Sequence, residues 1–117
     1  MGYDKLEVYQ KSYKLCLEIH KLTMSFPKHE LYEIGSQFRR AAVSIPLNIA
    51  EGYGRREYSK DFKKFLITAK ASSNEVIVLL NMVRDLGYIT EEGFEMLLVE
   101  FKHLERQLSK LIQTIRN

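Results

Sequence analysis

Three polar side chains that could take part in chemistry recur at helical spacing near the middle of the chain. Ser44, Asn48 and Glu51 follow one another at steps of four and three residues, so a helix would carry them on one face. A hydroxyl, an amide and a carboxylate in this order can recognise a polar ligand, or they can form a hydrogen-bonded network between helices or between subunits. Partners for such a network are expected in the next helical segment, at Ser72, Ser73 and Glu75.

Basic residues gather around the same segment. Residues 31–64 hold seven Lys and Arg against four Asp and Glu, which gives this part of the chain most of the positive charge. Guanidinium and ammonium groups bind phosphate oxygens, arginine through its planar fork of donors. Tyr53 and Tyr58 flank an arginine pair and offer rings on which unpaired bases can stack. The candidates for nucleic-acid contact are Arg39, Arg40, Arg55, Arg56, Lys60, Lys63 and Lys64.

The same basic residues also have a structural interpretation. They can form a solvated face whose charges pair locally with nearby carboxylates such as Glu57 and Asp61. Arg40 and Arg55 can also serve as the cations for Glu51 and Glu75. In that case the two arginines stabilise the bundle and do not bind phosphate. The sequence leaves both interpretations open.

No pattern in the sequence indicates catalysis, a metal or a cofactor. Glu100 and His103 have the Glu-x-x-His spacing of di-iron bundles, but no second motif of this kind accompanies them. Cys16 falls on an apolar helix face, which is typical of a small core residue. Gly52 and Gly54 form only a fragment of a glycine-rich phosphate loop. We therefore expect a protein that is not an enzyme and that holds neither a metal ion nor a cofactor.

Length and composition limit the class of protein. A chain of 117 residues suits one domain, residues 1–117, which is large enough to bury its own core. The formal net charge of +3 permits an anionic partner without requiring one. A single cysteine excludes an internal disulfide and suits a reducing compartment. No apolar run approaches the roughly 20 residues that span a bilayer, and the first residues do not resemble a secretory signal, so we expect a cytoplasmic protein without a membrane segment.

Hydrophobic periodicity predicts four helices and no strand. Apolar residues recur at steps of three and four over residues 6–25, 30–55, 59–87 and from 90 onward. In the fourth helix the pattern holds over three heptads, through Phe94, Leu97, Phe101, Leu104, Leu108, Leu111 and Ile115. Short connections favour antiparallel neighbours, so the sequence predicts an all-α, up-down-up-down antiparallel four-helix bundle.

A few residues with strong local preferences mark helix ends and one irregularity. Tyr58 or Ser59 is expected to cap the third helix. Gly87 is expected to end that helix in a left-handed conformation, and Thr90 to cap the fourth. Pro46 lies inside the second helix, where it removes one hydrogen bond and clashes with a carbonyl at a cost of about 3 kcal/mol. Because the apolar stripe keeps its phase across the proline, we expect one helix kinked at Pro46, and not two shorter helices.

Several stretches of the chain resemble one known family. They are RRAAVSIPLNIAEGYGRR (39–56), DFKKFLITAKASSNEV (61–76) and RDLGYIT (84–90), together with LEVYQKSYKL (6–15) and FPKHELY (26–32). They resemble the four-helix-bundle family first noticed as proteins encoded in intervening sequences of bacterial 23S rRNA genes. One branch of that family is the accessory variability protein of diversity-generating retroelements. The resemblance implies a homopentamer shaped like a ring or barrel, and for the retroelement branch a basic scaffold that binds nucleic acid and a reverse transcriptase.

Two hypotheses for function follow. The first is a non-enzymatic homo-oligomer that binds RNA or DNA electrostatically, through the basic residues of the second helix and of the start of the third. The alternative is a protein-interaction scaffold with a partner encoded by a neighbouring gene and no direct role for nucleic acid. Apolar residues beside the main stripes indicate surface for protein partners in either case. They are Val43, Leu47, Phe65, Leu79 and Leu98.

Overall fold

Four long helices and two short ones make up most of the computed structural model, which describes residues 2–116. The two short helices are the 3-10 helix η1 (Tyr3–Lys5) and the single turn α2 (Lys28–Leu31). The four long helices are α1 (Glu7–Thr23), α3 (Ile34–Gly54), α4 (Ser59–Asp85) and α5 (Glu91–Thr114). Residues 2–116 contain no strand. The prediction of an all-α protein with four long helices is confirmed.

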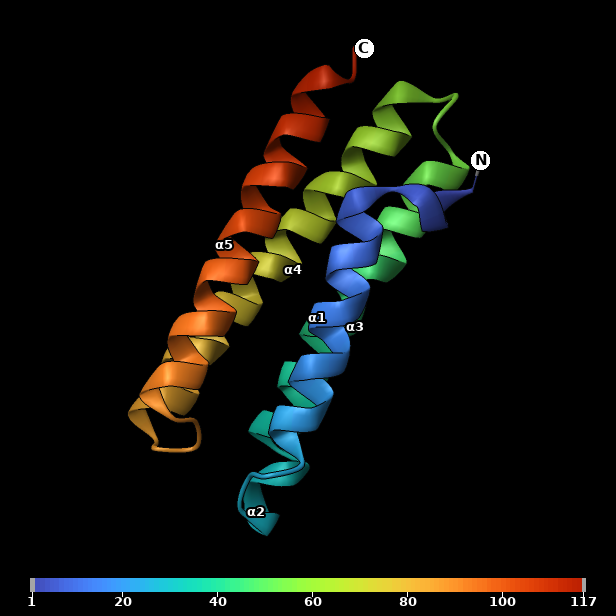
Figure 1. Ribbon diagram of the computed structural model, residues 1–117. Coiled ribbons are helices and arrows are strands. Elements are labelled where there is room, and N and C mark those ends of the chain that lie inside the picture. Colours follow the sequence, from blue (N-terminus) through green and yellow to red (C-terminus); the bar gives the residue numbers. More distant parts are fainter. Residues whose placement is uncertain (1, 117) are drawn as a thin grey trace.

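The long helices pack into an elongated bundle of 45 × 23 × 21 Å (Figure 1). The most extensive contact is between α3 and α4, while α1 packs on α3 and α5 packs on α4. The contact between α1 and α5 is the smallest of the four. In Figure 1 the chain reverses direction from each long helix to the next, and both termini lie at the end of the bundle that carries the α3–α4 connection. We call this the α3–α4 end.

The core consists largely of the predicted apolar stripes. Phe94, Phe101 and Leu104 of α5 are at most 1% exposed, and Ile45 and Ile49 of α3 are fully buried. The expectation for residues beside the stripes was wrong at one position, since Leu79 is buried among the core side chains of α4. Leu47, by contrast, is 63% exposed. Apolar surface outside the core is therefore present, although Leu79 is not part of it.

The second predicted helix begins later than expected. Residues 28–31 form the separate helical turn α2. Tyr32 and Glu33 interrupt the helix before α3 starts. The Arg39 guanidinium donates to the Leu31 carbonyl oxygen at 3.1 Å and to the Thr23 Oγ1 at 2.9 Å. A carbonyl at the end of α2, which lacks an intrahelical partner, is thus satisfied by a side chain of the next helix. These hydrogen bonds of Arg39 stabilise the interruption between α2 and α3.

Helix ends follow the prediction at Gly87 and Thr90. Gly87 adopts a φ of +79°, and Thr90 caps α5 by accepting a hydrogen bond from the Gly93 N–H at 3.0 Å. Helix α3 is continuous through Pro46, as expected, and the kink at this residue stays a prediction. Helix α4 begins at Ser59 with Tyr58 at its N-cap position, as predicted, but no side chain forms a capping hydrogen bond there.

Close packing of α3 on α4 requires a glycine. A Cβ atom added at Gly52 would lie 2.9 Å from the Phe65 Cβ and 3.3 Å from the Phe62 carbonyl oxygen. Gly54, two residues further along α3, has open space where its Cβ would be. The two glycines therefore separate the steric effect of a methyl group from its effect on helix propensity.

We expect Gly52→Ala to lower the free energy of unfolding by about 1–3 kcal/mol, because α3 and α4 must move apart to admit the methyl group. Gly54→Ala is the matched control and is expected to leave stability unchanged or slightly raised, since alanine favours a helix. Urea denaturation followed by circular dichroism measures both. Equal stabilities of the two variants would contradict the close approach at Gly52.

One ion pair joins the weakly packed helices α1 and α5. Lys11 Nζ lies 2.5 Å from the Glu100 Oε2 and donates to the His103 Nδ1 at 2.8 Å. The hydrogen bond from Lys11 holds the pKa of the Glu100 carboxyl below its ordinary value. A carboxyl whose pKa is lower in the folded state stabilises the fold above its unfolded-state pKa, and this contribution is lost as the pH falls through the folded-state pKa.

We expect Glu100→Gln to lower stability at pH 7 by less than about 1 kcal/mol, because the carboxylate is half exposed and solvent screens the pair. The difference from the unmodified protein should shrink as the pH falls through the lowered folded-state pKa of the Glu100 carboxyl, because the protonated group no longer pairs with Lys11. Thermal unfolding of both proteins between pH 3 and pH 7 checks this. A difference that persists at the lowest pH would show that the ion pair is not its cause.

By length and composition, α4 is the one helix within residues 2–116 that could cross a membrane. The sequence predicted no such segment, because no apolar run approaches the length that spans a bilayer. In the bundle α4 contacts both α3 and α5, and several of its apolar residues lie in the core. A core helix of this kind meets the same criteria of length and composition.

Candidate nucleic-acid interface

The seven basic candidates lie in two separate places. Arg39 and Arg40 are in the first half of α3, near the break after α2, whereas the other five surround the α3–α4 connection. Sixteen residues separate Arg39 from Arg55, which corresponds to about 24 Å along a helix. The seven residues therefore do not form one compact cluster in a single copy of the chain, and the two groups are described separately.

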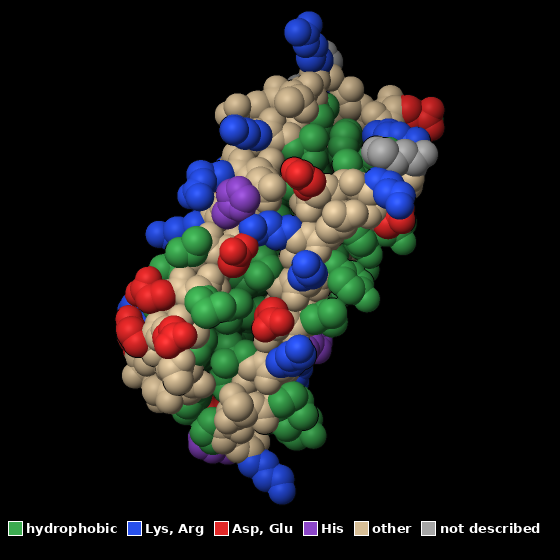
Figure 2. Space-filling view, in the orientation of Figure 1, with side chains coloured by type: hydrophobic (Ala, Val, Ile, Leu, Met, Phe, Trp, Pro, Cys, Tyr) green, Lys and Arg blue, Asp and Glu red, His purple; other side chains and the backbone are tan. Residues whose placement is uncertain are grey.

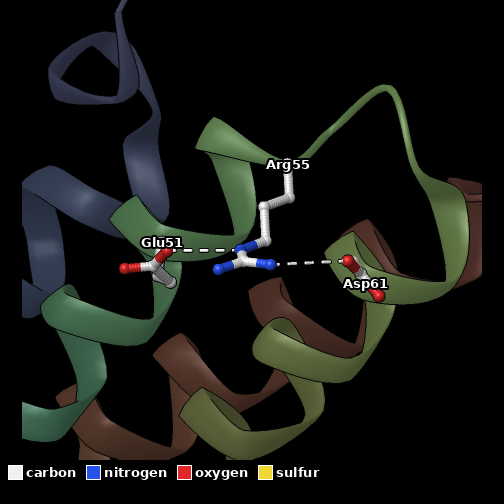
Figure 3. Close-up of polar contacts among 3 residues, drawn as sticks. All are labelled: Glu51, Arg55 and Asp61. Atoms are coloured by element: carbon white, nitrogen blue, oxygen red, sulfur yellow. Dashed lines mark hydrogen bonds and ion pairs between the residues drawn. The ribbon is translucent and has the colours of Figure 1, made fainter.

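Arg55 is bound within the protein. Its Nε lies 3.3 Å from the Glu51 Oε2, and its Nη1 lies 3.6 Å from the Asp61 Oδ2 (Figure 3). The guanidinium also lies 5.3 Å from the centre of the Phe65 ring. Arg55 thus links the last turn of α3 to the first turn of α4. This is the pairing with Glu51 that the structural interpretation of the sequence expected.

Arg56 is held in place but keeps free donors. Its Nη1 donates to the Tyr53 carbonyl oxygen at 2.9 Å, and its guanidinium stacks 4.2 Å from the centre of the Tyr53 ring. The Tyr53 ring in turn meets the edge of Phe62 at a centroid distance of 6.4 Å. Arginine has five N–H donors, so this exposed side chain can still bind an anion.

The three lysines follow the start of α4. Lys60 and Lys64 are four residues apart and exposed, so they share the outward face of the helix. Lys63 is half-buried. Asp61, the carboxylate between them in sequence, is directed to Arg55. The outward cations at the α3–α4 end are therefore Arg56, Lys60 and Lys64, which we call the basic cluster.

The other arginine pair belongs to a different surface. Arg39 is occupied by its two hydrogen bonds at the α2–α3 break, as described above. Arg40 is exposed and borders a shallow groove of about 340 Å³ between α1 and α3. The groove is lined by His20, Arg39, Arg40, Val43, Ser44, Leu47 and Asn48.

The polar stripe of α3 is partly joined into a network. Ser44 and Ser72 share a hydrogen bond of 2.8 Å between α3 and α4. Asn48 Nδ2 donates to the Ser44 Oγ at 3.0 Å and to the Ser44 carbonyl oxygen at 2.8 Å. Glu51 instead pairs with Arg55, and Glu75 is exposed. The Ser73 hydroxyl is buried without a hydrogen-bond partner among the described residues. The structure therefore connects Ser44, Asn48 and Ser72 within one chain.

Adjacent serines of α4 should respond differently to the loss of their hydroxyls. We expect Ser72→Ala to lower the free energy of unfolding by about 0.5–1.5 kcal/mol, because its bond to α3 is lost. Ser73→Ala should leave stability unchanged or raise it by up to about 2 kcal/mol, because a buried hydroxyl without a partner is removed. Urea denaturation of both variants tests this, and a larger loss for Ser73→Ala would contradict the assignment.

Cys16 and His20 form a pair that was not predicted, although their spacing of four residues on one helix could have indicated it. The Cys16 Sγ lies 3.8 Å from the His20 Nδ1, which is also 3.0 Å from the Cys16 carbonyl oxygen. Burial raises the pKa of the Cys16 thiol. A thiol that is buried and mostly protonated is a poor nucleophile, so the pair has the properties of a structural contact.

Metal binding finds no support in the geometry of the described residues. Glu100 and His103 both contact Lys11, whose ammonium group occupies the place a cation would take. Across residues 2–116, no cluster of three or more His, Cys, Asp or Glu side chains is arranged to hold a metal ion.

Fold and site together define a small helical-bundle protein whose candidate site is an exposed group of side chains and not a deep cavity. Residues 4–110 match the family described as 23S rRNA-intervening sequence protein, so the chain belongs to this family. It is also similar to a crystal structure from Bacteroides thetaiotaomicron VPI-5482, of a protein with unknown function from the S23 ribosomal protein family. The identity is 25% and the TM-score 0.83, over 92% of this chain and 96% of that one. The search of curated proteins gave no match.

Proposed function

We propose that the protein is a non-enzymatic, cytoplasmic nucleic-acid-binding bundle that contacts phosphates through the basic cluster. The observation that supports this most directly is the separation of paired from outward cations. Arg55 is neutralised by Glu51 and Asp61, whereas Arg56, Lys60 and Lys64 are exposed within one short stretch of chain. Exposed cations of this kind contact the phosphate oxygens of a nucleic acid.

Charge along the bundle supports the same assignment. Figure 2 shows acidic side chains gathered over the first turns of α5, where Glu91, Glu92 and Glu95 are exposed. This region is at the opposite end of the bundle from the α3–α4 end (Figure 1). A polyanion is repelled by one end and attracted to the other, so it approaches in one orientation. RNA is the first probe, because the family is described as 23S rRNA-intervening sequence protein.

The test is fluorescence anisotropy with a labelled single-stranded RNA of mixed sequence at several salt concentrations. For a strand that contacts three phosphates on one chain, the logarithm of the binding constant should fall with the logarithm of salt at a slope of about −2. Lys60→Glu combined with Lys64→Glu should weaken binding by more than about tenfold and make the slope shallower, since two phosphate contacts are lost.

The matched control is the same pair of charge changes away from the basic cluster, Lys21→Glu with Lys102→Glu, at exposed positions of α1 and α5. Both double variants have equal net charge, so only the location of the charges differs. Circular dichroism verifies that each keeps its helices. Equal loss of affinity in the two variants, or binding independent of salt, would refute a localised phosphate site.

We further propose that the protein acts as a homo-oligomer, with the homopentamer implied by the family resemblance as the expected state. Each copy would then contribute one basic cluster, and weak contacts to a long strand would combine through avidity. Exposed apolar side chains are available for contacts between copies, among them Leu17 of α1 and Leu47 of α3. The solution mass from light scattering tests this directly, and a monomer would contradict it.

A protein-interaction scaffold is the second candidate function, and the outer face of α4 favours it. Ile67, Val78 and Met82 of this helix are each about half exposed, at spacings that place them on one side. An exposed apolar stripe on a helix is a common contact surface for proteins. A partner encoded by a neighbouring gene, such as a reverse transcriptase, would bind here. Val78→Lys would then break the complex, and charge reversal in the basic cluster would not.

A further inference from the structure

The α3–α4 connection carries two tyrosines, and the structure gives them different roles. Tyr53 is packed into the protein, since its ring contacts both the Arg56 guanidinium and the edge of Phe62. Tyr58 is 64% exposed. Only its backbone makes hydrogen bonds among the described residues, with the Tyr58 N–H donating to the Arg55 carbonyl at 2.9 Å and its own carbonyl accepting from the Phe62 N–H at 3.0 Å. An ordered backbone thus holds an aromatic ring out toward solvent.

Cations lie on both sides of Tyr58 in the sequence. Arg56 precedes it by two residues, so their Cα atoms lie at most about 7 Å apart. Stacking on Tyr53 fixes the Arg56 guanidinium in place. Lys60 follows Tyr58 by two residues and is exposed. An exposed tyrosine beside fixed and flexible cations matches the requirements of a nucleotide, whose base stacks on a ring while its phosphates contact charges.

We infer that Tyr58 is the base-stacking residue of the site, and that the protein prefers single-stranded to double-stranded nucleic acid. This inference rests on the proposed function and specifies its ligand. In a duplex the faces of the bases are covered by their neighbours, so an external ring gains nothing by stacking. An unpaired base offers a free π face, and its stacking on an aromatic side chain adds to the binding by the phosphates.

Competing explanations of the exposed ring are weaker. A tyrosine needed for folding would be packed, as Tyr53 is. A tyrosine that anchors a protein partner is usually surrounded by other apolar side chains, whereas the side chains next to Tyr58 in sequence are Glu57 and Ser59, with Arg56 and Lys60 beyond them. The positive charges of Arg56 and Lys60 favour a polyanionic ligand.

The experiment compares a single-stranded RNA of twelve nucleotides with a blunt-ended duplex of twelve base pairs, by anisotropy at low salt. We expect Tyr58→Ala to weaken single-strand binding by about 5- to 150-fold, the range for loss of one stacked base, and to leave duplex binding unchanged. Tyr58→Phe should retain single-strand affinity, because stacking needs the ring and not its hydroxyl.

The matched control is Tyr32→Ala, which removes an even more exposed tyrosine, 79% accessible, from the break between α2 and α3. Its neighbours include Glu33, so it should not affect RNA binding. If Tyr58→Ala binds single strands as the unmodified protein does, or weakens both ligands equally, the stacking role is overturned while the phosphate site stands. If the unmodified protein binds neither RNA at low salt, the proposed function fails and the inference fails with it.

Discussion

The close approach of α3 and α4 is the constraint on which the rest of the molecule depends. It requires the absence of a side chain at Gly52, where a methyl group would collide with Phe65. Because the helices lie this close, the hydroxyls of Ser44 and Ser72 meet across the interface. At the end of the same interface, Arg55 reaches carboxylates on both helices. The pairing leaves the neighbouring cations on the outside, so the packing of two helices decides which charges are available to a ligand.

Features set by neighbours in sequence were predictable, and features set by distant residues were not. The apolar stripe of α5, the left-handed Gly87 and the Thr90 cap all depend on residues within about one helical turn, and the structure contains each of them. Arg39 was assigned to phosphate binding because nothing in its local sequence reveals Thr23, 16 residues earlier, as its partner. The contact of Lys11 with His103 spans 92 residues and had no signal in the sequence at all.

The candidate site illustrates the same limit. Seven basic residues looked alike in sequence, and their chemistry was equally suited to phosphate. Packing separates them, since a guanidinium placed between two carboxylates is neutralised whereas one stacked on a ring keeps donors free. The two tyrosines of the connection differ for the same reason. Composition drew attention to this region, but which of its side chains are paired and which are exposed depends on contacts that the sequence does not reveal.

The buried cysteine gives the bundle an internal reporter. Cys16 is the one thiol of the chain, it lies where α1 meets the core, and burial both blocks access and raises its pKa. A thiol reagent can modify it only when α1 moves away from its neighbours and the thiolate forms in water. The rate of alkylation therefore measures how often this helix detaches from the folded protein, without any introduced label. Assembly or ligand binding that holds α1 in place would lower the rate at which Cys16 is alkylated.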